Sequence, residues 1–259
     1  MDDESRPLTT IRRTFEVMEL LQDVGPSGPT ALAEHMDLPT STVYDYLRTL
    51  TELGYLVRDS GSYRLSPRIY TMAGRMKYRD RLFLTAKPEM KRVASDRGEL
   101  VGLTVEYDGK GLILHQEAGG QALSLGTYPG AIVPLHTHAS GKVILAEMDD
   151  DELDDFLASH ELEARTERTV TDPERLRAEL ETVRERDYAV DWDEQVVGMG
   201  MLAVPIRIDG VLHGTLNVVA PSGRMRSESY QSELLETLRE ANDRITINYQ
   251  YGESGQPRD

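Results

Sequence analysis

The stretch ALAEHMDLPTSTVYDYLRTLTELGYLVRDSGSYRLSPRI, residues 31–69, decides the fold of the first part of this chain. Its apolar residues recur at helical spacing and predict a short helix over 31–35 and a longer helix that Gly54 ends. The longer helix carries one stripe of residues at i, i+4 and i+7, which we expect to be buried. This stripe consists of Val43, Leu47 and Leu50.

Hydroxyl side chains stand where both helices are expected to begin. Thr30 is the expected N-cap of the short helix, and Thr40 or Ser41 is the expected N-cap of the longer one. A hydroxyl oxygen at this position can accept a free backbone N–H of the first turn. The tight connection Asp37-Leu38-Pro39 separates the two helices.

A hairpin and a further helix flank this pair. Two alternating stretches, Tyr55–Arg58 and Ser62–Leu65, surround Asp59-Ser60-Gly61, whose glycine suits the positive φ of a tight turn. Upstream, Ile11–Gln22 is expected to be a helix with an apolar face. That face consists of Ile11, Phe15, Met18 and Leu21. Helix, helix, turn, helix and hairpin is the order of a winged helix-turn-helix, a DNA-binding unit.

The longer helix is the expected recognition helix of that unit. Steps of about 100° per residue place Tyr44, Asp45 and Arg48 opposite the buried stripe. Tyr44 and Arg48 are expected to reach base edges in the major groove. Asp45 either accepts from a cytosine amino group or orients Arg48. Further DNA contacts, mostly to phosphates, are expected from Thr40, Ser41 and Thr42 at the helix start and from Arg12, Arg13, Arg58 and Arg64.

The net charge argues against general affinity for nucleic acid. The chain has 45 acidic and 29 basic residues, a net charge of −16. Residues 1–70 hold 7 basic and 11 acidic residues, a net of −4, which leaves −12 for the other 189. Counterion release would therefore contribute little, and specific hydrogen bonds and dimerisation must contribute more. The acid-rich, lysine-poor composition indicates an extreme halophile, with an acidic mesophilic protein as the alternative.

Composition also excludes several classes of site. Cysteine is absent, which excludes disulfides, thiolate metal sites and a cysteine nucleophile. No apolar run approaches the roughly 18 residues of a membrane span. The acidic start Met1–Glu4 does not fit a signal peptide, so we expect a cytoplasmic protein.

The rest of the chain mixes strands with helices. Two charged helical segments are expected over about 68–80 and 84–97, and a last helix over about 228–249. The pairs of strands 100–106 with 111–116 and 201–208 with 212–219 flank Asp108-Gly109 and Asp209-Gly210, which are hairpin signals. Thr171 and Glu174 are expected to form a capping box that opens a helix to about Arg186. The acidic run Asp149–Asp155 fits a solvated helix start.

These residues resemble the IclR-type (isocitrate lyase regulator) transcription factors. Residues 12–70 look like the winged helix-turn-helix of that family. The resemblance continues in VPLHTHASGKVILAEMDDDEL (133–153), in TVTDPERLRAELETVRERDYAVDWDEQVVGMGMLAVPI (169–206) and in GTLNVVAPSGRM (214–225). It thus covers nearly the whole chain.

The resemblance implies an α+β protein. Its parts would be a winged helix-turn-helix DNA-binding domain at 1–67, a linker helix at 68–83, a GAF/PAS-like α/β effector-binding and oligomerisation domain at 84–251, and a disordered tail at 252–259. The family binds palindromic operator DNA as a homodimer or a dimer of dimers. Members of the family respond to small organic, sugar or aromatic acids. The resemblance implies no enzymatic activity and no cofactor.

The resemblance also implies the residues of an effector pocket. Ala139 and Ser140 begin a helix whose N–H groups could hold a carboxylate. The other implied residues are Asp191, Met201, Asn217 and Val219. Several relatives have a cysteine where Met201 stands and serines where Asn217 and Val219 stand. We therefore expect a ligand larger or more apolar than a two- or three-carbon oxoacid. The basic residue often found where Thr40 stands is missing, which leaves the operator sequence open.

Alternative chemistry stays open at three places. His136 and His138, with His115 or Asp191, could bind a metal if they lay in a strand, where i and i+2 share a face. Ser140-Gly141-Lys142 is only a fragment of a phosphate-binding loop. Ser140, His136 and Asp191 have the residue types of a hydrolase triad, but no G-x-S-x-G elbow is present. The rival functions are thus a ligand-independent architectural repressor and a hydrolase with an accessory DNA-binding module.

Overall fold

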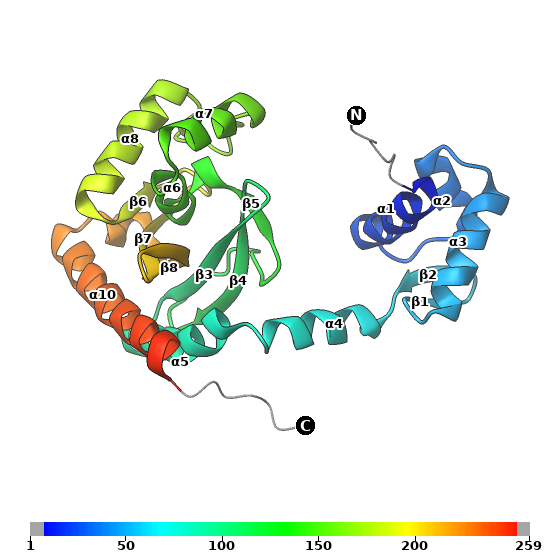
Figure 1. The fold of residues 1–259 in the computed structure, drawn as a ribbon, viewed down its shortest axis with the longest axis horizontal. Coiled ribbons are helices and arrows are strands. Elements are labelled where there is room, and N and C mark those ends of the chain that lie inside the picture. The colour runs from blue at the N-terminus through cyan, green and yellow to red at the C-terminus, as the bar shows by residue number, and fades with distance from the viewer. Residues whose placement is uncertain (1–7, 253–259) are drawn as a thin grey trace, which may run out of the picture. The chain divides into compact units, whose positions relative to one another are not determined.

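The computed structural model describes residues 8–252 and divides into two compact units, one ending at Tyr78 and one beginning at Arg79 (Figure 1). The boundary thus falls within residues 68–83, the segment expected to be a linker. No helix among residues 8–252 is long and apolar enough to cross a membrane. The acidic start and residues 253–259 of the expected tail lie outside the described residues.

The first unit consists of helices around one small hairpin. Its elements are α1 (Thr9–Val24), α2 (Pro29–Met36), α3 (Thr40–Glu52), β1 (Leu56–Asp59), β2 (Ser62–Leu65) and α4 (Pro67–Lys77). β1 and β2 pair antiparallel across a turn in which Ser60 and Gly61 both have positive φ. Ser27 exchanges two backbone hydrogen bonds with Tyr63, which ties the α1–α2 connection to the hairpin. The predicted winged helix-turn-helix is confirmed.

The core of this unit includes the stripe predicted for α3. Val43, Leu47 and Leu50 are all buried, as expected. The apolar face predicted for α1 is wrong at its start, because Ile11 is 54% exposed and Phe15 is 57% exposed. Leu21 is buried as predicted, and Val17, which the predicted face did not include, is buried as well. The side chains of Val17 and Ile11 point about 120° apart around the helix, so Ile11 lies outside the face that Val17 buries.

Prolines decide where three helices begin, and this overturns the expected caps. Thr30 lies inside α2, because Pro29 is the first helical residue and Gly28 the N-cap. Neither Thr40 nor Ser41 caps α3, since Pro39 holds the N-cap position and no side-chain cap bond forms.

The same holds for the expected capping box at Thr171. Pro173 is the first residue of α8, so Asp172 becomes the N-cap and accepts from the N–H of Arg175 at 2.8 Å. Proline favours the first helical position because its fixed φ suits a helix and its missing N–H is not needed there.

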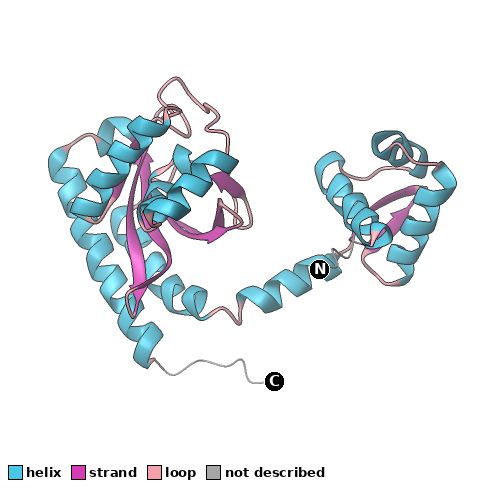
Figure 2. Ribbon diagram, turned by 45° about the horizontal axis from the view of Figure 1, so that its top comes forward, coloured by secondary structure: helices cyan, strands magenta, loops and turns pink. Residues whose placement is uncertain are grey.

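The second unit is an antiparallel sheet covered by helices on both faces (Figure 2). Its strands are β3 (Leu100–Tyr107), β4 (Lys110–Ala118), β5 (Ile132–Pro134), β6 (Ala189–Trp192), β7 (Met199–Ile208) and β8 (Val211–Pro221). Its helices are α5 (Arg81–Arg97), the short η1 (Leu135–Thr137), α6 (Ala139–Ala146), α7 (Asp150–Ser159), α8 (Pro173–Arg186), α9 (Ser222–Met225) and α10 (Glu228–Tyr251). The strand order is β5-β4-β3-β8-β7-β6.

Both predicted hairpins of this unit are present. β3 and β4 join at Asp108-Gly109, and β7 and β8 join at Asp209-Gly210. All four turn residues have positive φ, which aspartate and glycine adopt more readily than other residues do. The acidic run also fits its prediction, because Asp149 and Glu152 form the capping box of α7.

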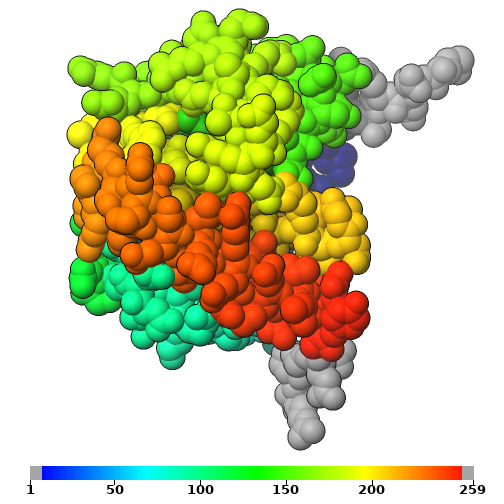
Figure 3. Space-filling model, turned by 90° about the vertical axis from the view of Figure 1, so that its left-hand side faces the viewer, coloured from blue at the N-terminus to red at the C-terminus, as the bar shows by residue number. Residues whose placement is uncertain are grey.

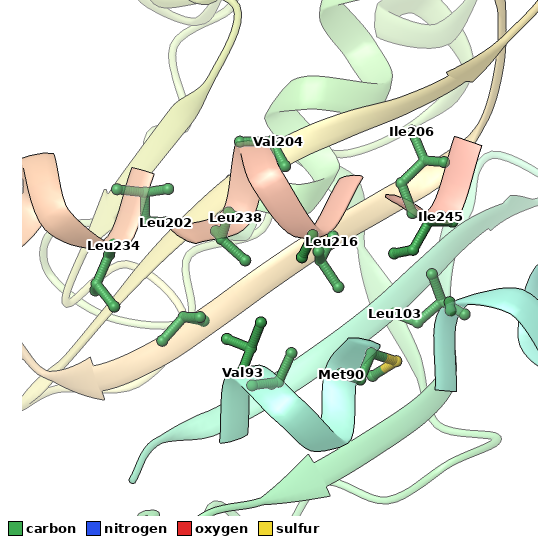
Figure 4. Close-up of a cluster of buried hydrophobic side chains, with 14 of the residues drawn as sticks. Met90, Val93, Leu103, Leu202, Val204, Ile206, Leu216, Leu234, Leu238 and Ile245 are labelled. Atoms are coloured by element: carbon green, nitrogen blue, oxygen red, sulfur yellow. The ribbon is translucent and has the colours of Figure 1, made fainter. Parts of the chain in front are cut away.

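Two apolar cores lie on opposite faces of this sheet. On one face, α5 and α10 lie side by side, and α10 runs along the surface of the unit (Figure 3). Their residues Met90, Val93, Leu234 and Leu238 pack against the strands around Leu216 (Figure 4). On the other face, α6, α7 and α8 enclose a second cluster. The sheet therefore holds the start of α6 at a fixed place over its second face.

Candidate functional sites

The outer face of α3 is open to solvent. The side chain of Arg48 is 60% exposed, and Tyr44 is 41% exposed. Arg48 lies between two carboxylates of its own helix, with Asp45 at 3.6 Å and Glu52 at 3.9 Å. The helix thus presents an aromatic ring and a guanidinium on the side away from its buried stripe.

The start of α3 adds hydroxyl groups to this face. Thr40 and Ser41 are exposed, and Thr42 is half-buried. The N–H of Thr42 already donates to the carbonyl of Pro39 at 2.9 Å. The N–H groups before it lie ahead of the first intrahelical bond, and such groups favour anions such as phosphate.

The expected basic residues lie on two other elements of the same unit. Arg58 and Arg64 are exposed on the hairpin, and the guanidinium of Arg58 lies 5.7 Å from the ring centre of Tyr63. Arg12 and Arg13 lie near the start of α1, where Arg12 pairs with Glu16 at 3.3 Å. The unit therefore offers arginines on α1 and on the hairpin besides Arg48 on α3.

A cavity opens on the sheet of the second unit. Its empty space, open mouth included, is about 360 Å³. Three implied pocket residues, Met201, Asn217 and Val219, line it. The others that line it are Gly102, Thr104, Ile113, Gln116, Leu125, Thr127, Val133, His138 and Gln195. None of these side chains carries a formal charge apart from the histidine, whose charge depends on protonation.

Strand register explains why the implied residues meet. Val219 pairs with Met201, and Met201 pairs with Asp191 on the next strand, so all three lie in one row across the sheet. Asn217 stands two residues before Val219 and shares its face. A Cβ at Gly102 would lie 2.6 Å from the Oδ1 of Asn217, so glycine makes room for this amide.

The start of α6 contacts this row through one side chain. The hydroxyl oxygen of Ser140 accepts from the Nδ2 of Asn217 at 2.9 Å, and it lies 3.8 Å from the sulfur of Met201. Ala139 is fully buried and its side chain belongs to the second apolar cluster. Neither residue is among those that line the cavity, although Ser140 contacts two residues that do.

Asp191 is buried beside the cavity rather than in its wall. Its Oδ1 accepts from the N–H of Glu194 at 2.8 Å. Burial raises the pKa of Asp191 to about 7, although the hydrogen bond from Glu194 favours the charged form. This carboxyl therefore changes its charge near neutral pH.

A buried ion pair ties α6 to the loop after β6. The Nζ of Lys142 lies 2.6 Å from one carboxylate oxygen of Glu194 and 2.7 Å from Glu179 on α8. Burial raises the pKa of Glu194, and the charge of Lys142 opposes that rise. Lys142 thus connects α6, α8 and the loop after β6.

The metal interpretation of His136 and His138 is wrong in its geometry. His136 lies in the short helix η1 and His138 is the N-cap of α6, so the two do not share a strand face. The Nε2 of His136 faces the carbonyl of Glu163 at 3.0 Å. Among residues 8–252, no group of three His, Cys, Asp or Glu side chains is placed to hold a metal ion.

Sequence reasoning missed the part of the cavity that β3 and β4 contribute. Gly102 and Thr104 stand at i and i+2, so both face the cavity side of the sheet. A small and a polar residue within the otherwise apolar start of this strand were the available signal. Leu125, Thr127 and Gln195 come from connections without regular structure, and no periodic pattern marks such residues.

A winged helix-turn-helix followed by an α/β unit with a cavity defines a class: DNA-binding regulators with a ligand-binding domain. Residues 10–60 match the family profile described as the IclR helix-turn-helix domain. Residues 77–247 match the profile of the bacterial transcriptional regulator IclR C-terminal domain. The chain belongs to the IclR family, and it is a DNA-binding transcriptional regulator.

Known transcriptional regulators align with this chain over nearly its full length. KdgR, a transcriptional regulator of Escherichia coli, is 28% identical and aligns over 97% of this chain and 96% of its own length. The probable regulator ArcR of Halobacterium salinarum is 24% identical over 94% of this chain and 95% of its own length.

Solved structures agree as well. The IclR of Thermotoga maritima is similar with a TM-score of 0.76 and 26% identity, covering 93% of this chain and 99% of its own. An IclR homologue of Microbacterium hydrocarbonoxydans, solved with 4-hydroxybenzoate, has a TM-score of 0.78 and 27% identity, covering 93% and 97%.

Proposed function

We propose that this chain binds a palindromic operator through α3 and the β1–β2 hairpin. Tyr44 and Arg48 read base edges in the major groove, while Ser41, Thr42 and the hairpin arginines contact phosphates. The observation that carries this proposal is the outer face of α3, where Tyr44 and Arg48 are exposed while the opposite stripe is buried.

We further propose that the chain acts as a homodimer or a dimer of dimers. Two half-sites one helical turn apart require two reading helices at a fixed spacing. The first unit exposes large apolar side chains on α1 and α4, which favours a partner for this unit. These side chains are Ile11, Phe15, Tyr70, Met72 and Met76. A dimer also adds affinity that a reading unit without net positive charge lacks.

The cavity of the second unit is the proposed effector site. Its wall is mainly apolar and neutral polar, which suits a small organic or aromatic acid with one polar end. Ala139, Ser140 and Asp191 are proposed to support the polar end, and Met201, Asn217 and Val219 to contact the body. We propose that residues 68–83 transmit binding to the spacing of the two reading helices.

Genomic selection of bound DNA fragments, followed by fluorescence anisotropy, tests the proposed operator binding. The selected fragments are expected to share an inverted repeat that the purified protein binds. A thermal-shift screen of organic, sugar and aromatic acids is expected to yield an acid that raises the melting temperature, since it binds only the native state. That acid should change the operator Kd by about 5- to 150-fold. DNA binding without any repeat, or an acid without effect on operator affinity, would contradict the proposal.

A further inference from the structure

His138 is the N-cap of α6, and its position fixes which ring nitrogen carries a proton. Its Nδ1 accepts the N–H of Gly141 at 3.1 Å. A nitrogen that accepts a hydrogen bond has no proton of its own, so the proton of this ring is on Nε2. The doubly protonated ring could not accept from Gly141. The ring is therefore neutral, and burial, together with the nearby His136 and Lys142, lowers the pKa of His138 to about 3.

The Nε2 of this ring is a buried donor without an acceptor among the described residues. His138 is 1% exposed, and its Nε2 has no hydrogen-bond partner. A Cβ at Gly111 would lie 3.3 Å from this Nε2, 3.2 Å from Val133 Cγ2 and 3.3 Å from Thr104 Cγ2. Val133 and Thr104 both line the cavity, as His138 does, so the ring edge lies beside the cavity wall. Leaving a buried N–H unpaired costs stability, which proteins rarely accept without a use for the group.

The other cavity residues limit what this N–H can meet. No lysine, arginine or carboxylate lines the cavity, so no side chain in its wall neutralises the charge of a bound ligand. Lys142, the cation near the start of α6, is held by Glu194 and Glu179. A neutral N–H donates to an oxygen and cannot accept from an ammonium or amidinium group.

Building on the effector site proposed above, we propose that His138 determines effector specificity by donating its Nε2–H to an oxygen of the bound acid. The acid presents a carboxylate, carbonyl or hydroxyl oxygen to this N–H. Its body lies against Val133, Met201 and Val219. A cationic ligand of the same shape is rejected because it offers no acceptor.

Two variants separate the two roles of this ring. In His138→Asn the amide oxygen can take the place of Nδ1 and keep the cap on Gly141, while the Nε2–H is lost. In His138→Gln the longer amide can place an N–H near the position of Nε2, while the cap is weakened. The asparagine variant is expected to keep the wild-type melting temperature and to bind acids about tenfold more weakly. The glutamine variant is expected to melt lower and to bind within about threefold of wild type.

Benzoate and benzamidine are matched probes because they share a shape. Benzoate presents two acceptor oxygens, and benzamidine presents two donor nitrogens. Melting temperature and calorimetric Kd are measured with both, and with 4-hydroxybenzoate and pyruvate as further acids. Benzoate or another acid is expected to bind wild type, and benzamidine is not. If all three acids fail to bind wild type, the proposed effector class is contradicted and this proposal with it. If an acid binds both variants as tightly as wild type, only the role of His138 is overturned.

Nitrogen NMR of the labelled full-length protein gives a readout that a purely structural role would not move. The His138 signals are assigned by their loss in the asparagine variant. Without ligand, Nδ1 is expected to be unprotonated and Nε2 protonated, and the reverse tautomer would overturn the proposal. Addition of the bound acid is expected to move the Nε2–H proton downfield while Nδ1 keeps its position. An acid that binds without moving that proton leaves the effector site in place and refutes the role of His138.

Discussion

Arg48 lies between two carboxylates on an exposed helix face, which keeps its guanidinium extended along α3. Both ion pairs are exposed, so each stabilises the helix by less than about 1 kcal/mol. Hydrogen bonds to a guanine edge are worth more than these pairs. The guanidinium of Arg48 can therefore exchange these carboxylates for a DNA base at a small cost in free energy.

We expect Arg48→Ala to weaken specific operator binding by about 1–3 kcal/mol, because one bidentate base contact is lost. Fluorescence anisotropy with the selected operator and with scrambled DNA measures the change. Arg175→Ala is the matched control, since Arg175 on α8 is 65% exposed and also pairs with a carboxylate at i+4. Equal operator protection by the Arg48 variant and wild type in footprinting would show that the recognition face is wrongly assigned.

Asp191 gives the protein a pH dependence of known sign. Its pKa is raised to about 7, so between its unfolded value near 4 and pH 7 the folded state binds a proton that the unfolded state lacks. Stability from this group is thus highest at low pH and is lost as pH rises to about 7. Glu194, Lys142 and Asp193 are the charges that act on it.

Asp191→Asn removes the loss of stability that Asp191 causes as pH rises. The asparagine oxygen can still accept from the N–H of Glu194. We expect its stability relative to wild type to rise between pH 4.5 and pH 7, by at most about 1.4 kcal/mol per pH unit, and to stay level above pH 7. Urea unfolding at a series of pH values measures this difference. The exposed Asp243→Asn serves as control, and a difference for Asp191→Asn that does not vary with pH would contradict the raised pKa.

Individual residues were predictable where one periodic pattern governed them. The stripe of α3 is buried because three apolar residues repeat at one spacing. Met201, Asn217 and Val219 were implied by the family resemblance, and strand register explains why they meet at the cavity. Ile11 and Phe15 were wrongly predicted, since α1 carries two apolar faces and sequence alone does not say which one meets the core. The free Nε2 of His138 depends on a cap that only coordinates reveal.

At the scale of elements, turn chemistry was informative and helix starts were not. Asp-Gly pairs located both hairpins of the sheet because few residues tolerate positive φ. Three helix caps were wrongly predicted, because proline takes the first helical position in α2 and α8 and the N-cap position in α3. The connections that complete the cavity could not be predicted, because their positions depend on packing between distant segments.

The buried ion pair between Lys142 on α6 and Glu194 is expected to contribute to the stability of the fold. We expect Lys142→Met to lower the free energy of unfolding by about 3–5 kcal/mol, because it leaves the carboxylate of Glu194 buried without a cation. The double variant Lys142→Met with Glu194→Gln is expected to recover most of that loss, since it also removes the buried charge of Glu194 that the single variant leaves without a cation. Denaturant unfolding measures both, with the exposed Lys110→Met as control. A double variant as unstable as the single one would show that packing, not charge, is the role of Lys142.

At the scale of the whole molecule, the net charge of −16 is spread over both parts of the chain, with −4 in residues 1–70 and −12 in the rest. Like charges repel in the compact state, and salt reduces this repulsion. The screening length falls from about 10 Å at 0.1 M to about 3 Å at 1 M. A halophilic origin remains a prediction of the composition, and salt dependence is its physical consequence.

We expect the melting temperature to rise by several degrees between 0.1 M and 1 M KCl, equivalent to about 1–2 kcal/mol, and to level off above 1 M. Levelling off identifies screening, because the exclusion of a solute from the protein surface grows steadily with its concentration. Choline chloride at equal ionic strength is the control, since screening depends on ionic strength and not on the cation. Operator affinity should fall over the same range, because salt weakens phosphate contacts. A melting temperature that falls or stays constant from 0.1 M to 1 M would show that carboxylate repulsion does not limit the stability of this protein.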